Sequence, residues 1–496
     1  MKSFIKWFQM NHGFVDVSAL DIANFPAAEG GRGIIAIREI PVGHTLFTIP
    51  RLLTLSTRTS RLPSIFGEEK WKKMKLGEGW VGLILCMMWE TASGPSSKWF
   101  EYLATLPTRF DTPMFWDEHD LGELAGTSLV EKLGRADAEQ SYREKLLPAI
   151  ESRPDLFPHN LVAAYYSLEM YHIMGSRILS RSFNVERWDS AEGEDEIPTT
   201  NSGHEDSMDV DYPEGGEDIG EPRHAETEGD GEEEDNVEED DAENDPSDIA
   251  MVPMADLLNA RYGSENAKLY YEEHELKMVS TKPIETGEQI WNTYGDLPNS
   301  ELLRRYGHVD LLPLPQGEGN PGDVVEVRAD IVVSSIARKY HTLSSEASQE
   351  RIDWWLEEGG DDVFILESDL ELPPALVSLI RILLLPGEGW EKIKAKGNPP
   401  KPKIDNEVLA ITRDVITARA EAYPTSISDD EKLLSSPVTE NRRHAIVVRI
   451  GEKKILRDMV QQIGRMENRL KQEKGKSKRK SRDDTNETLP SKKSRK

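Results

Sequence analysis

Two stretches decide the fold of this chain: residues 251–271, MVPMADLLNARYGSENAKLYY, and residues 290–310, IWNTYGDLPNSELLRRYGHVD. Asn259 and Asn266 interrupt the apolar runs of the first stretch, and Tyr-Gly pairs beginning at Tyr294 and Tyr306 punctuate the second. A strand-like run, LKMVSTKPI, and a turn, ETGEQ, lie between them. This spacing of Asn and Tyr-Gly residues between apolar runs makes the two stretches the most informative part of the chain.

The net charge of −30 is concentrated in one segment. Residues 189–248 hold 27 Asp or Glu and one basic residue, a net charge of −26, whereas residues 471–496 carry a net charge of +7. The rest of the chain therefore carries only −11, an ordinary value for an enzyme. The 189–248 segment has almost no large apolar residues, so we expect a disordered acidic insertion within a domain.

Cysteine usage and the apolar runs exclude several classes of protein. The single cysteine, Cys86, excludes intrachain disulfides and a Cys-clustered zinc site, and we expect no metal. Lys6 and Gln9 interrupt the first ten residues, unlike a signal peptide. The longest apolar run, residues 80–89, is about half the ~20 residues of a membrane-spanning helix. These features predict a soluble intracellular protein.

The N-terminal part of the chain alternates between strand and helix signals. Apolar spacing predicts a helix over residues 1–20. Residues 30–56 carry β-branched runs split by Pro41-Val42-Gly43, which predicts strands joined by a tight turn. Residues 78–185 read as mostly helical, and residues 160–181 are the most regularly amphipathic part of them.

The C-terminal part is predicted to be mainly helical. Helical patterns recur from residue 311, and the last predicted helix runs from Glu440 to Leu470. We therefore predict a first domain over 1–310, a helical domain over 311–470 and a basic, disordered tail over 471–496. The tail lacks interleaved aromatic residues, so no direct nucleic-acid role is predicted.

The motifs GGRG (30–33), MADLLNA (254–260), NTYG (292–295) and YGHV (306–309) resemble in their order the SET domain, the fold of lysine methyltransferases. The resemblance covers residues 20–310 without the acidic insertion. It is closest to the Rubisco large-subunit methyltransferase type and its fungal relatives that methylate ribosomal proteins. It implies an α+β fold, with small β-sheets and an inserted helical region, followed by a mainly helical substrate-binding domain.

Tyr294 is the catalytic candidate. Methyl transfer to a lysine amine is an in-line displacement that needs a neutral, aligned amine in a site that excludes bulk water. A phenol oxygen can orient the amine and stabilise the cationic transition state. An isolated NTYG is more often an ordinary core tyrosine, but its position downstream of DLLN favours the catalytic role. The resemblance also places Tyr294 beside the cofactor, S-adenosyl-L-methionine.

Five more residues match cofactor-contacting positions of the family. Gly30, Gly31 and Arg32 match the loop whose backbone holds the amino-acid moiety of S-adenosylmethionine. Arg181 matches an arginine beside cofactor and substrate, although an arginine late in a helix is by itself more often a solvated C-terminal charge. Asn259 matches the asparagine that contacts the cofactor, with a turn cap as the alternative. GGRG does not follow a strand and open a helix, which excludes a Rossmann fingerprint.

The chain departs from the family at one cofactor-binding position. Ala260 stands where the family has histidine, so any contact with the cofactor there must come from the backbone. Asp256 matches a substrate-contacting position, and a carboxylate suits a cationic peptide. Tyr306 matches a tyrosine that lines the lysine channel, with core packing as an equal alternative. Asn266 matches the second asparagine of the pattern, which is more often structural than catalytic.

The resemblance predicts an S-adenosylmethionine-dependent protein-lysine N-methyltransferase that acts on a basic protein, a large-subunit ribosomal protein first of all. Two Lys/Arg clusters, KSKRK and SKKSRK, resemble a nuclear import signal and predict a nuclear location, with the cytoplasm as a second one. Two alternatives stay open: a protein-histidine methyltransferase of the same fold, and a non-catalytic adaptor that retains the SET fold for peptide binding.

Overall fold

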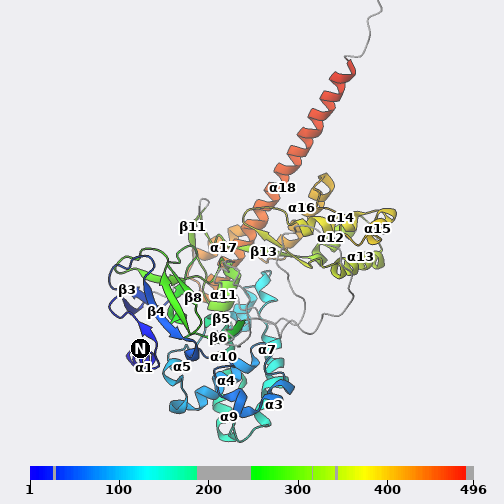
Figure 1. The fold of residues 1–496 in the computed structure, drawn as a ribbon. Helices are drawn as coiled ribbons and strands as arrows, with labels where there is room; N and C mark the ends of the chain where they lie inside the picture. The colour runs from blue at the N-terminus through cyan, green and yellow to red at the C-terminus, as the bar shows by residue number, and fades with distance from the viewer. Residues whose placement is uncertain (26–29, 187–246, 315–316, 341–343, 487–496) are drawn as a thin grey trace, which may run out of the picture. The chain divides into compact units, whose positions relative to one another are not determined.

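The computed structural model describes residues 1–25, 30–186, 247–314, 317–340 and 344–486. These residues divide into two compact units (Figure 1). The first unit contains residues 1–117, 131–297 and 301–310, and the second contains residues 118–130, 298–300 and 311–496. Neither residues 118–130 nor residues 298–300 were expected in the second unit, because nothing in their sequence sets them apart from their neighbours.

Two four-stranded sheets and a two-stranded hairpin make up the β structure of the first unit. One sheet has the order β1-β4-β9-β8 and the other the order β2-β3-β10-β7, whereas β5 pairs only with β6. Every pairing is antiparallel except that of β10 with β7. The strands are β1 (Phe14–Val15), β2 (Leu20–Asn24), β3 (Arg32–Ala36), β4 (Thr45–Pro50), β5 (Ser182–Glu186), β6 (Ser247–Met251), β7 (Asn259–Ala260), β8 (Ala267–Tyr271), β9 (Glu275–Ser280) and β10 (Gln289–Asn292).

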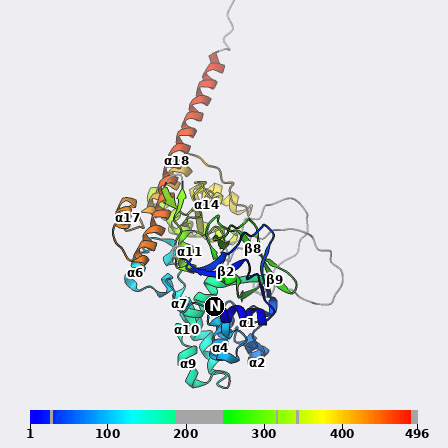
Figure 2. The same ribbon diagram turned by 90° about the vertical axis from the view of Figure 1, so that its left-hand side faces the viewer.

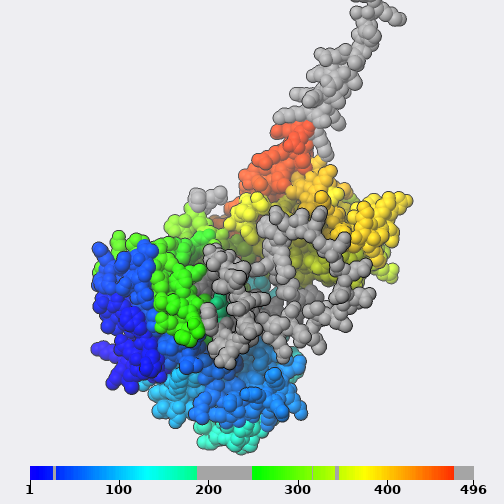
Figure 3. Space-filling model, viewed as in Figure 1, coloured from blue at the N-terminus to red at the C-terminus, as the bar shows by residue number. Residues whose placement is uncertain are grey.

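The helices of the first unit lie mostly at the opposite end from the sheets, apart from the first and the last of them, which lie beside the strands (Figures 1 and 2). They are α1 (Lys2–Met10), α2 (Leu62–Phe66), α3 (Glu68–Lys73), α4 (Val81–Ala92), α5 (Phe100–Leu103), α7 (Arg135–Ser141), α8 (Leu147–Glu151), α9 (His159–Tyr165), α10 (Leu168–Arg181) and most of α11 (Asn299–Tyr306). In the space-filling view, the N-terminal segment lies directly beside the strands of residues 250–300 (Figure 3). Segments far apart in the sequence therefore share one body.

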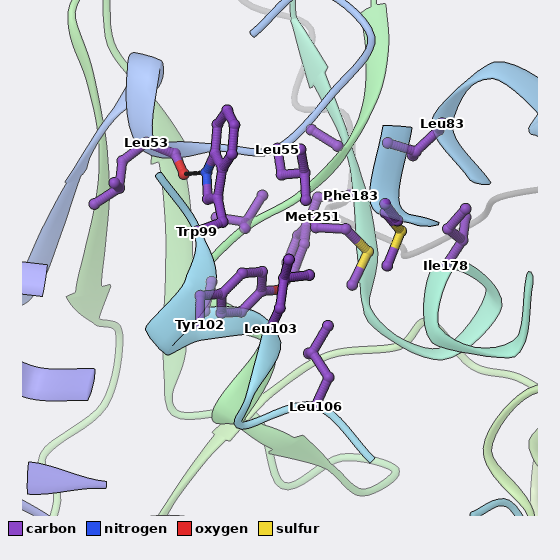
Figure 4. Close-up of a cluster of buried hydrophobic side chains, with 14 of the residues drawn as sticks. Leu53, Leu55, Leu83, Trp99, Tyr102, Leu103, Leu106, Ile178, Phe183 and Met251 are labelled. Atoms are coloured by element: carbon purple, nitrogen blue, oxygen red, sulfur yellow. Dashed lines mark hydrogen bonds between the residues drawn. The ribbon is translucent and has the colours of Figure 1, made fainter. Parts of the chain in front are cut away.

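One apolar core joins these helices to the sheets. The close-up in Figure 4 shows Leu83 of α4, Ile178 of α10, Phe183 of β5 and Met251 of β6 directed into a common cluster. Trp99 is fully buried in the same cluster and donates its indole N–H to the carbonyl oxygen of Leu53 at 2.8 Å. α4 is buried on nearly every face, which explains the uninterrupted apolar run in its sequence.

The predicted helix over residues 1–20 is wrong beyond Met10. His12 has a positive φ of 67°, and a Cβ at Gly13 would lie 2.5 Å from the Phe8 ring, so the chain turns sharply there. Residues from Phe14 onward then enter β1 and β2. The prediction of strands with a tight turn over residues 30–56 is confirmed by β3 and β4, and Gly43 has a φ of 79° in the turn.

Residues 160–181 form two helices where the sequence predicted one amphipathic stretch. Ser167 separates them, because its side chain caps α10 by accepting the backbone N–H of Met170 at 3.3 Å. The cap therefore marks the start of a separate helix, α10, which ends at Arg181. The wider prediction of a mostly helical region over residues 78–185 is confirmed by the helices from α4 to α10.

The acidic insertion lies between two paired strands. β5 and β6 form an antiparallel hairpin in which Val185 faces Asp248, and residues 187–246 lie outside the described residues. The described residues resume at Ser247, inside the segment 189–248 that was predicted to be disordered, because Asp248 pairs with Val185 and lies 3.3 Å from Arg58. The acidic segment therefore lies between two paired strands of the first unit.

The second unit is mainly helical, with its own apolar core. Its helices are α6 (Glu118–Gly122), α12 (Ala329–Lys339), α13 (Ser345–Glu357), α14 (Pro374–Leu384), α15 (Gly387–Lys394), α16 (Asn406–Ala420), α17 (Ile427–Leu434) and α18 (Glu440–Asn486). Two small strand pairs, which the sequence did not predict, join β11 (Leu312–Leu314) to β12 (Gly317–Gly319) and β13 (Val324–Arg328) to β14 (Val363–Glu367). α18 continues past the predicted end at Leu470, since residues 471–486 are rich in lysine and arginine, which favour helix.

Buried charges tie the second unit together. Asp430 is fully buried between Arg449, at 2.8 Å, and Lys453, at 2.5 Å. Arg419 of α16 donates to the carbonyl oxygen of Gly126 at 2.8 Å, which attaches the 118–130 segment. None of the helices in the described part of the chain combines the length and apolar character needed to cross a membrane.

Ile34→Ala should destabilise the first unit far more than Ile37→Ala. Ile34 of β3 is completely buried, whereas Ile37 is 47% exposed just after the same strand. Truncating a buried isoleucine to alanine costs about 2–5 kcal/mol, whereas an exposed position changes stability by about 0.5 kcal/mol or less. Urea unfolding followed by circular dichroism measures the difference. Equal shifts of the unfolding midpoint for the two variants would contradict the assigned core.

Candidate active site

Three strands bring Asn259 to the glycine loop. β7 begins at Asn259 and pairs in parallel with β10, which pairs in turn with β3. The Asn259 amide therefore reaches across the sheet and donates to Gln289 Oε1 at 2.7 Å and to the Arg32 carbonyl oxygen at 3.4 Å. Asn259 is fixed by side-chain and backbone partners from two other strands, which makes a mere turn cap the weaker interpretation.

Gly30 and Gly31 have φ values of 89° and 70°, a region that L side chains rarely adopt. A Cβ at Gly30 would lie 2.4 Å from the Asn259 side chain, whereas a Cβ at Gly31 would meet no atom within 4 Å. Gly30 therefore lets the loop approach Asn259 closely, and Gly31 leaves open space above the loop. The structure therefore brings the predicted residues Gly30, Gly31 and Asn259 together.

Asn266 serves as a structural link between strands. Its side chain accepts the backbone N–H of Trp291 at 2.8 Å and donates to the Gln289 carbonyl oxygen at 3.1 Å. It is 2% exposed. These bonds hold the segment before β8 against β10, so the placement agrees with the predicted structural role.

Asp256 is the charged centre of the site. It lies in a short 3₁₀ turn, Ala255–Leu257, which follows Met254, a buried non-glycine residue with a φ of 82°. Such strained conformations cluster at functional sites. Its Oδ2 accepts the hydroxyl of Tyr102 at 3.0 Å, and its backbone carbonyl accepts Arg181 Nη1 at 2.5 Å.

Burial controls the protonation of this cluster. It raises the pKa of Asp256 to about 6, against the opposing effects of Arg181, the Tyr102 hydrogen bond and Arg32. It also lowers the pKa of Arg32, whose Nη2 donates to the Thr105 carbonyl oxygen at 2.7 Å. Within the described residues, Oδ1 of Asp256 and Nε of Arg181 are buried and make no hydrogen bond. An acceptor and a donor without partners fit a polar ligand.

Tyr294 stacks face to face on Tyr306. Their ring centroids are 4.1 Å apart and the rings are 7° from parallel. The Tyr294 hydroxyl donates to the Leu258 carbonyl oxygen at 3.4 Å, and burial raises the pKa of this phenol to about 12. The structure thus brings both predicted tyrosines to one place, where the hydroxyl of Tyr294 stays protonated at neutral pH.

A small pocket, with a cavity volume of about 10 Å³, lies beside this pair. Ala260 and Tyr294 line it, together with Arg261, Tyr262, Gly263, Thr293, Gly295, Asp296, Leu297, Leu302 and Asp310. Because Ala260 has only a methyl group, polar contacts at that position of the pocket have to come from the backbone. The pocket is about the size of one water molecule and lies next to the catalytic candidate.

Two residues of the cluster escaped the sequence analysis. Tyr102 lies in α5 within a run that reads as ordinary helix, and Gln289 opens β10 after a turn. Neither belongs to a recognisable motif, and only the folded chain brings them to Asp256 and Asn259. The sequence carries no signal that could have found either residue.

Comparison with known proteins agrees with this architecture. Residues 342–456 match the family described as Rubisco LSMT substrate-binding. The structure resembles the SET domain of LSMT bound to lysine and AdoHcy, with a TM-score of 0.63 and 17% identity over 95% of this chain and 92% of that one. The chain is similar to SET-domain methyltransferases of the Rubisco type. The predicted family and the predicted α+β fold class are confirmed.

Curated relatives carry the same enzyme class in their names. Ribosomal lysine N-methyltransferase 4 of Saccharomyces cerevisiae is 27% identical over 77% of this chain and 71% of its own length. N-lysine methyltransferase SETD6 of Homo sapiens is 26% identical over 87% of this chain and 84% of its own. The prediction of a protein-lysine N-methyltransferase is confirmed at the level of enzyme class. The roles of the individual site residues stay predictions.

Gly30→Ala should lower the melting temperature of this SET methyltransferase more than Gly31→Ala does. Both variants place an alanine at positive φ, at a cost of about 1–2 kcal/mol. Only at Gly30 does the new Cβ also collide with Asn259. Thermal unfolding followed by circular dichroism compares the two variants directly. Equal losses would show that the close approach of Gly30 to Asn259 does not constrain the loop.

Proposed function

We propose that this chain methylates a lysine of a large-subunit ribosomal protein and does so in the nucleus. The reaction class is N-methylation of protein lysine with S-adenosylmethionine as the methyl donor, the chemistry of Rubisco-type SET enzymes. The observation that carries the reaction class is the position of Tyr294, whose ring stacks on Tyr306 and whose hydroxyl donates to the Leu258 carbonyl oxygen.

The residues at the site fit S-adenosylmethionine. The loop at Gly30 and Gly31 offers backbone groups with open space at Gly31, and Asn259 and Arg32 stand beside it. Arg181, Tyr294 and the backbone of Ala260 would complete the contacts. When bound, the cofactor supplies a methyl group activated by its positive sulfur. No metal ligand and no covalent intermediate are needed for this transfer.

Tyr294 orients the lysine amine and does not deprotonate it. With a pKa of about 12, its phenol stays neutral at physiological pH, so its oxygen can accept a hydrogen bond from the amine. Alignment of the amine lone pair with the methyl carbon lowers the barrier because the displacement requires a linear approach. The lysine ammonium group first loses one proton to solvent, and the neutral amine that results then accepts the methyl group.

Asp256 supports the approach of a cationic side chain. Its Oδ1 is buried without a partner, which leaves an acceptor for a lysine ammonium group or for an ordered water. Arg181 donates to the backbone carbonyl oxygen of Asp256, so this hydrogen bond does not occupy the carboxylate oxygens. A charged lysine can thus be held first and then lose its proton near Tyr294.

A ribosomal protein is the proposed substrate because ribosomal proteins are lysine-rich and this chain carries a strong negative charge. The name of the yeast relative, ribosomal lysine N-methyltransferase 4, supports this substrate. The 27 Asp or Glu of residues 189–248 favour encounters with basic partners over acidic ones. The clusters KSKRK and SKKSRK support a nuclear location, where such proteins are met before assembly.

Asn259→Ala should weaken cofactor binding, and Tyr294→Phe should slow turnover while cofactor binding persists. Loss of the Asn259 amide removes the group that faces the glycine loop, whereas Tyr294→Phe removes only the orienting oxygen. We expect at least a tenfold higher Kd for the first variant and about a 10²-fold lower kcat for the second. Calorimetry with S-adenosylmethionine measures binding, and transfer of radiolabelled methyl to extracted ribosomal proteins measures turnover.

Tyr270→Phe is the matched control for this experiment, because Tyr270 is 45% exposed on β8 and lies outside the site. It should bind and turn over as the wild type does. The ribosomal proteins should come from cells that lack this chain, so that target lysines are unmodified. No methyl transfer to any of these proteins by folded wild-type enzyme would exclude the proposed substrate class.

Acid hydrolysis of the labelled product should yield methyl-lysine and no methyl-histidine. The orienting hydroxyl and the carboxylate of Asp256 suit a primary ammonium group that loses a proton on arrival. Amino-acid analysis of the hydrolysate separates the two products. A methyl-histidine product would establish the alternative activity of the same fold. Absence of cofactor binding by folded wild type would instead favour a non-catalytic adaptor, with Ala260 as the lost contact.

A further inference from the structure

Tyr102 forms a hydrogen bond with the Asp256 side chain, although Tyr102 belongs to no sequence motif. Its hydroxyl donates to Asp256 Oδ2 at 3.0 Å, and both residues are buried. It is the one side-chain hydrogen bond that the described structure gives to this carboxylate, because the contact from Arg181 goes to the backbone carbonyl. The orientation of the carboxylate therefore depends on Tyr102.

The Tyr102 ring is held rigidly. It packs against Phe4 and Trp7 of α1, with ring centroids 6.3 Å and 6.4 Å away. Figure 4 shows Tyr102, Leu103 and Leu106 from one segment set into the buried apolar cluster. A fully buried ring with neighbours on α1 and in the core presents its hydroxyl in one direction only.

The same segment also supports the arginines of the site. The Thr105 carbonyl oxygen accepts Arg32 Nη2 at 2.7 Å, and the Pro107 carbonyl oxygen accepts Arg177 Nε at 3.0 Å. Residues 102–107 thus supply a hydroxyl to the carboxylate and carbonyl oxygens to two neighbouring cations. One short segment orients positive and negative groups together.

The charged and titratable groups around Asp256 come from four elements. They are Arg181 of α10, Arg32 of β3, Tyr102 of α5 and Tyr294, which follows β10. Burial raises the pKa of the Asp256 carboxyl, and the two arginines and the Tyr102 hydrogen bond oppose that rise. Burial also raises the pKa of the Tyr102 phenol well above its usual range, so its hydroxyl stays a proton donor.

We infer that Tyr102 is a positioning residue that orients the Asp256 side chain and holds it as a carboxylate for the incoming lysine ammonium. The effect of Tyr102 on catalysis rests on the proposed lysine methyltransferase function. The hydrogen bond between Tyr102 and Asp256 does not depend on that function. In this role Tyr102 acts through Asp256.

The test compares Tyr102→Phe with wild type across pH, alone and combined with Asp256→Asn. Tyr142→Phe is the matched control, since it removes another tyrosine hydroxyl of the same unit, one that donates to the Tyr166 carbonyl oxygen at 3.0 Å. The full-length protein is used throughout. Extracted ribosomal proteins and radiolabelled S-adenosylmethionine are the activity probes, and calorimetry checks cofactor binding.

In the activity arm, loss of the hydrogen bond should raise the pKa of Asp256 and move the acid limb of kcat/KM to higher pH. For a rise of about one pH unit from the present value of about 6, Tyr102→Phe should be about fivefold less active than wild type at pH 6 and within about twofold at pH 8. Cofactor affinity should stay within about threefold. Tyr142→Phe should give the same ratio to wild type at every pH.

A second arm needs no turnover. Because the folded pKa of Asp256 lies above its ordinary 3.8, stability falls as pH rises through about 6. In Tyr102→Phe the fall should continue to higher pH, so the gap in Tm between wild type and variant should widen from pH 6 to pH 8. With Asn at position 256 the carboxyl is gone, and the gap should no longer change with pH.

The two arms separate the possible failures. A wild type without methyl transfer overturns the proposed function but leaves the Tm arm to decide the inference. A Tm gap and an activity ratio that stay constant across pH overturn the role of Tyr102 even if the enzyme is active. A pH-dependent Tm gap that persists in the Asp256→Asn background also overturns it, because the effect then arises elsewhere.

Discussion

The burial of the Asp256 carboxyl is the constraint on which the site depends. A carboxyl group removed from water must find donors or give up its charge. This one is met by a hydroxyl from α5 and faced by arginines from α10 and β3. Three elements that are distant in the sequence must therefore pack together before the site can form. The arrangement of the site thus depends on the correct packing of the first unit.

β10 is the second organising element, because it joins segments that the insertion keeps far apart in the sequence. It pairs with β3 on one side and β7 on the other. The Asn266 side chain makes two hydrogen bonds to the β10 backbone, one with the Gln289 carbonyl oxygen and one with the Trp291 N–H. Tyr294 lies two residues beyond the end of β10, so the pairing of β10 also restricts the position of Tyr294. Such rigid support suits the role proposed for Tyr294, the orientation of an amine.

The sequence predicted the residues that belong to motifs and missed those that only packing assembles. Asn259 and Tyr294 could be placed because their spacing marks strand ends in a known family. Tyr102 and Gln289 could not, since a tyrosine in a helical run and a glutamine after a turn are ordinary. The same limit explains the helix that ends early at Met10, where the turn depends on a contact with the Phe8 ring.

The hairpin of β5 and β6 explains how this enzyme accommodates its long acidic insertion. Paired strands hold the two ends of the inserted segment next to each other whatever its length. The entropy of closing a flexible loop rises only with the logarithm of its length, by about 0.6 kcal/mol for each doubling. A segment of another length can therefore join this strand pair at a small cost in free energy, and the pair is a permissive place to graft a tag, a sensor or a docking sequence.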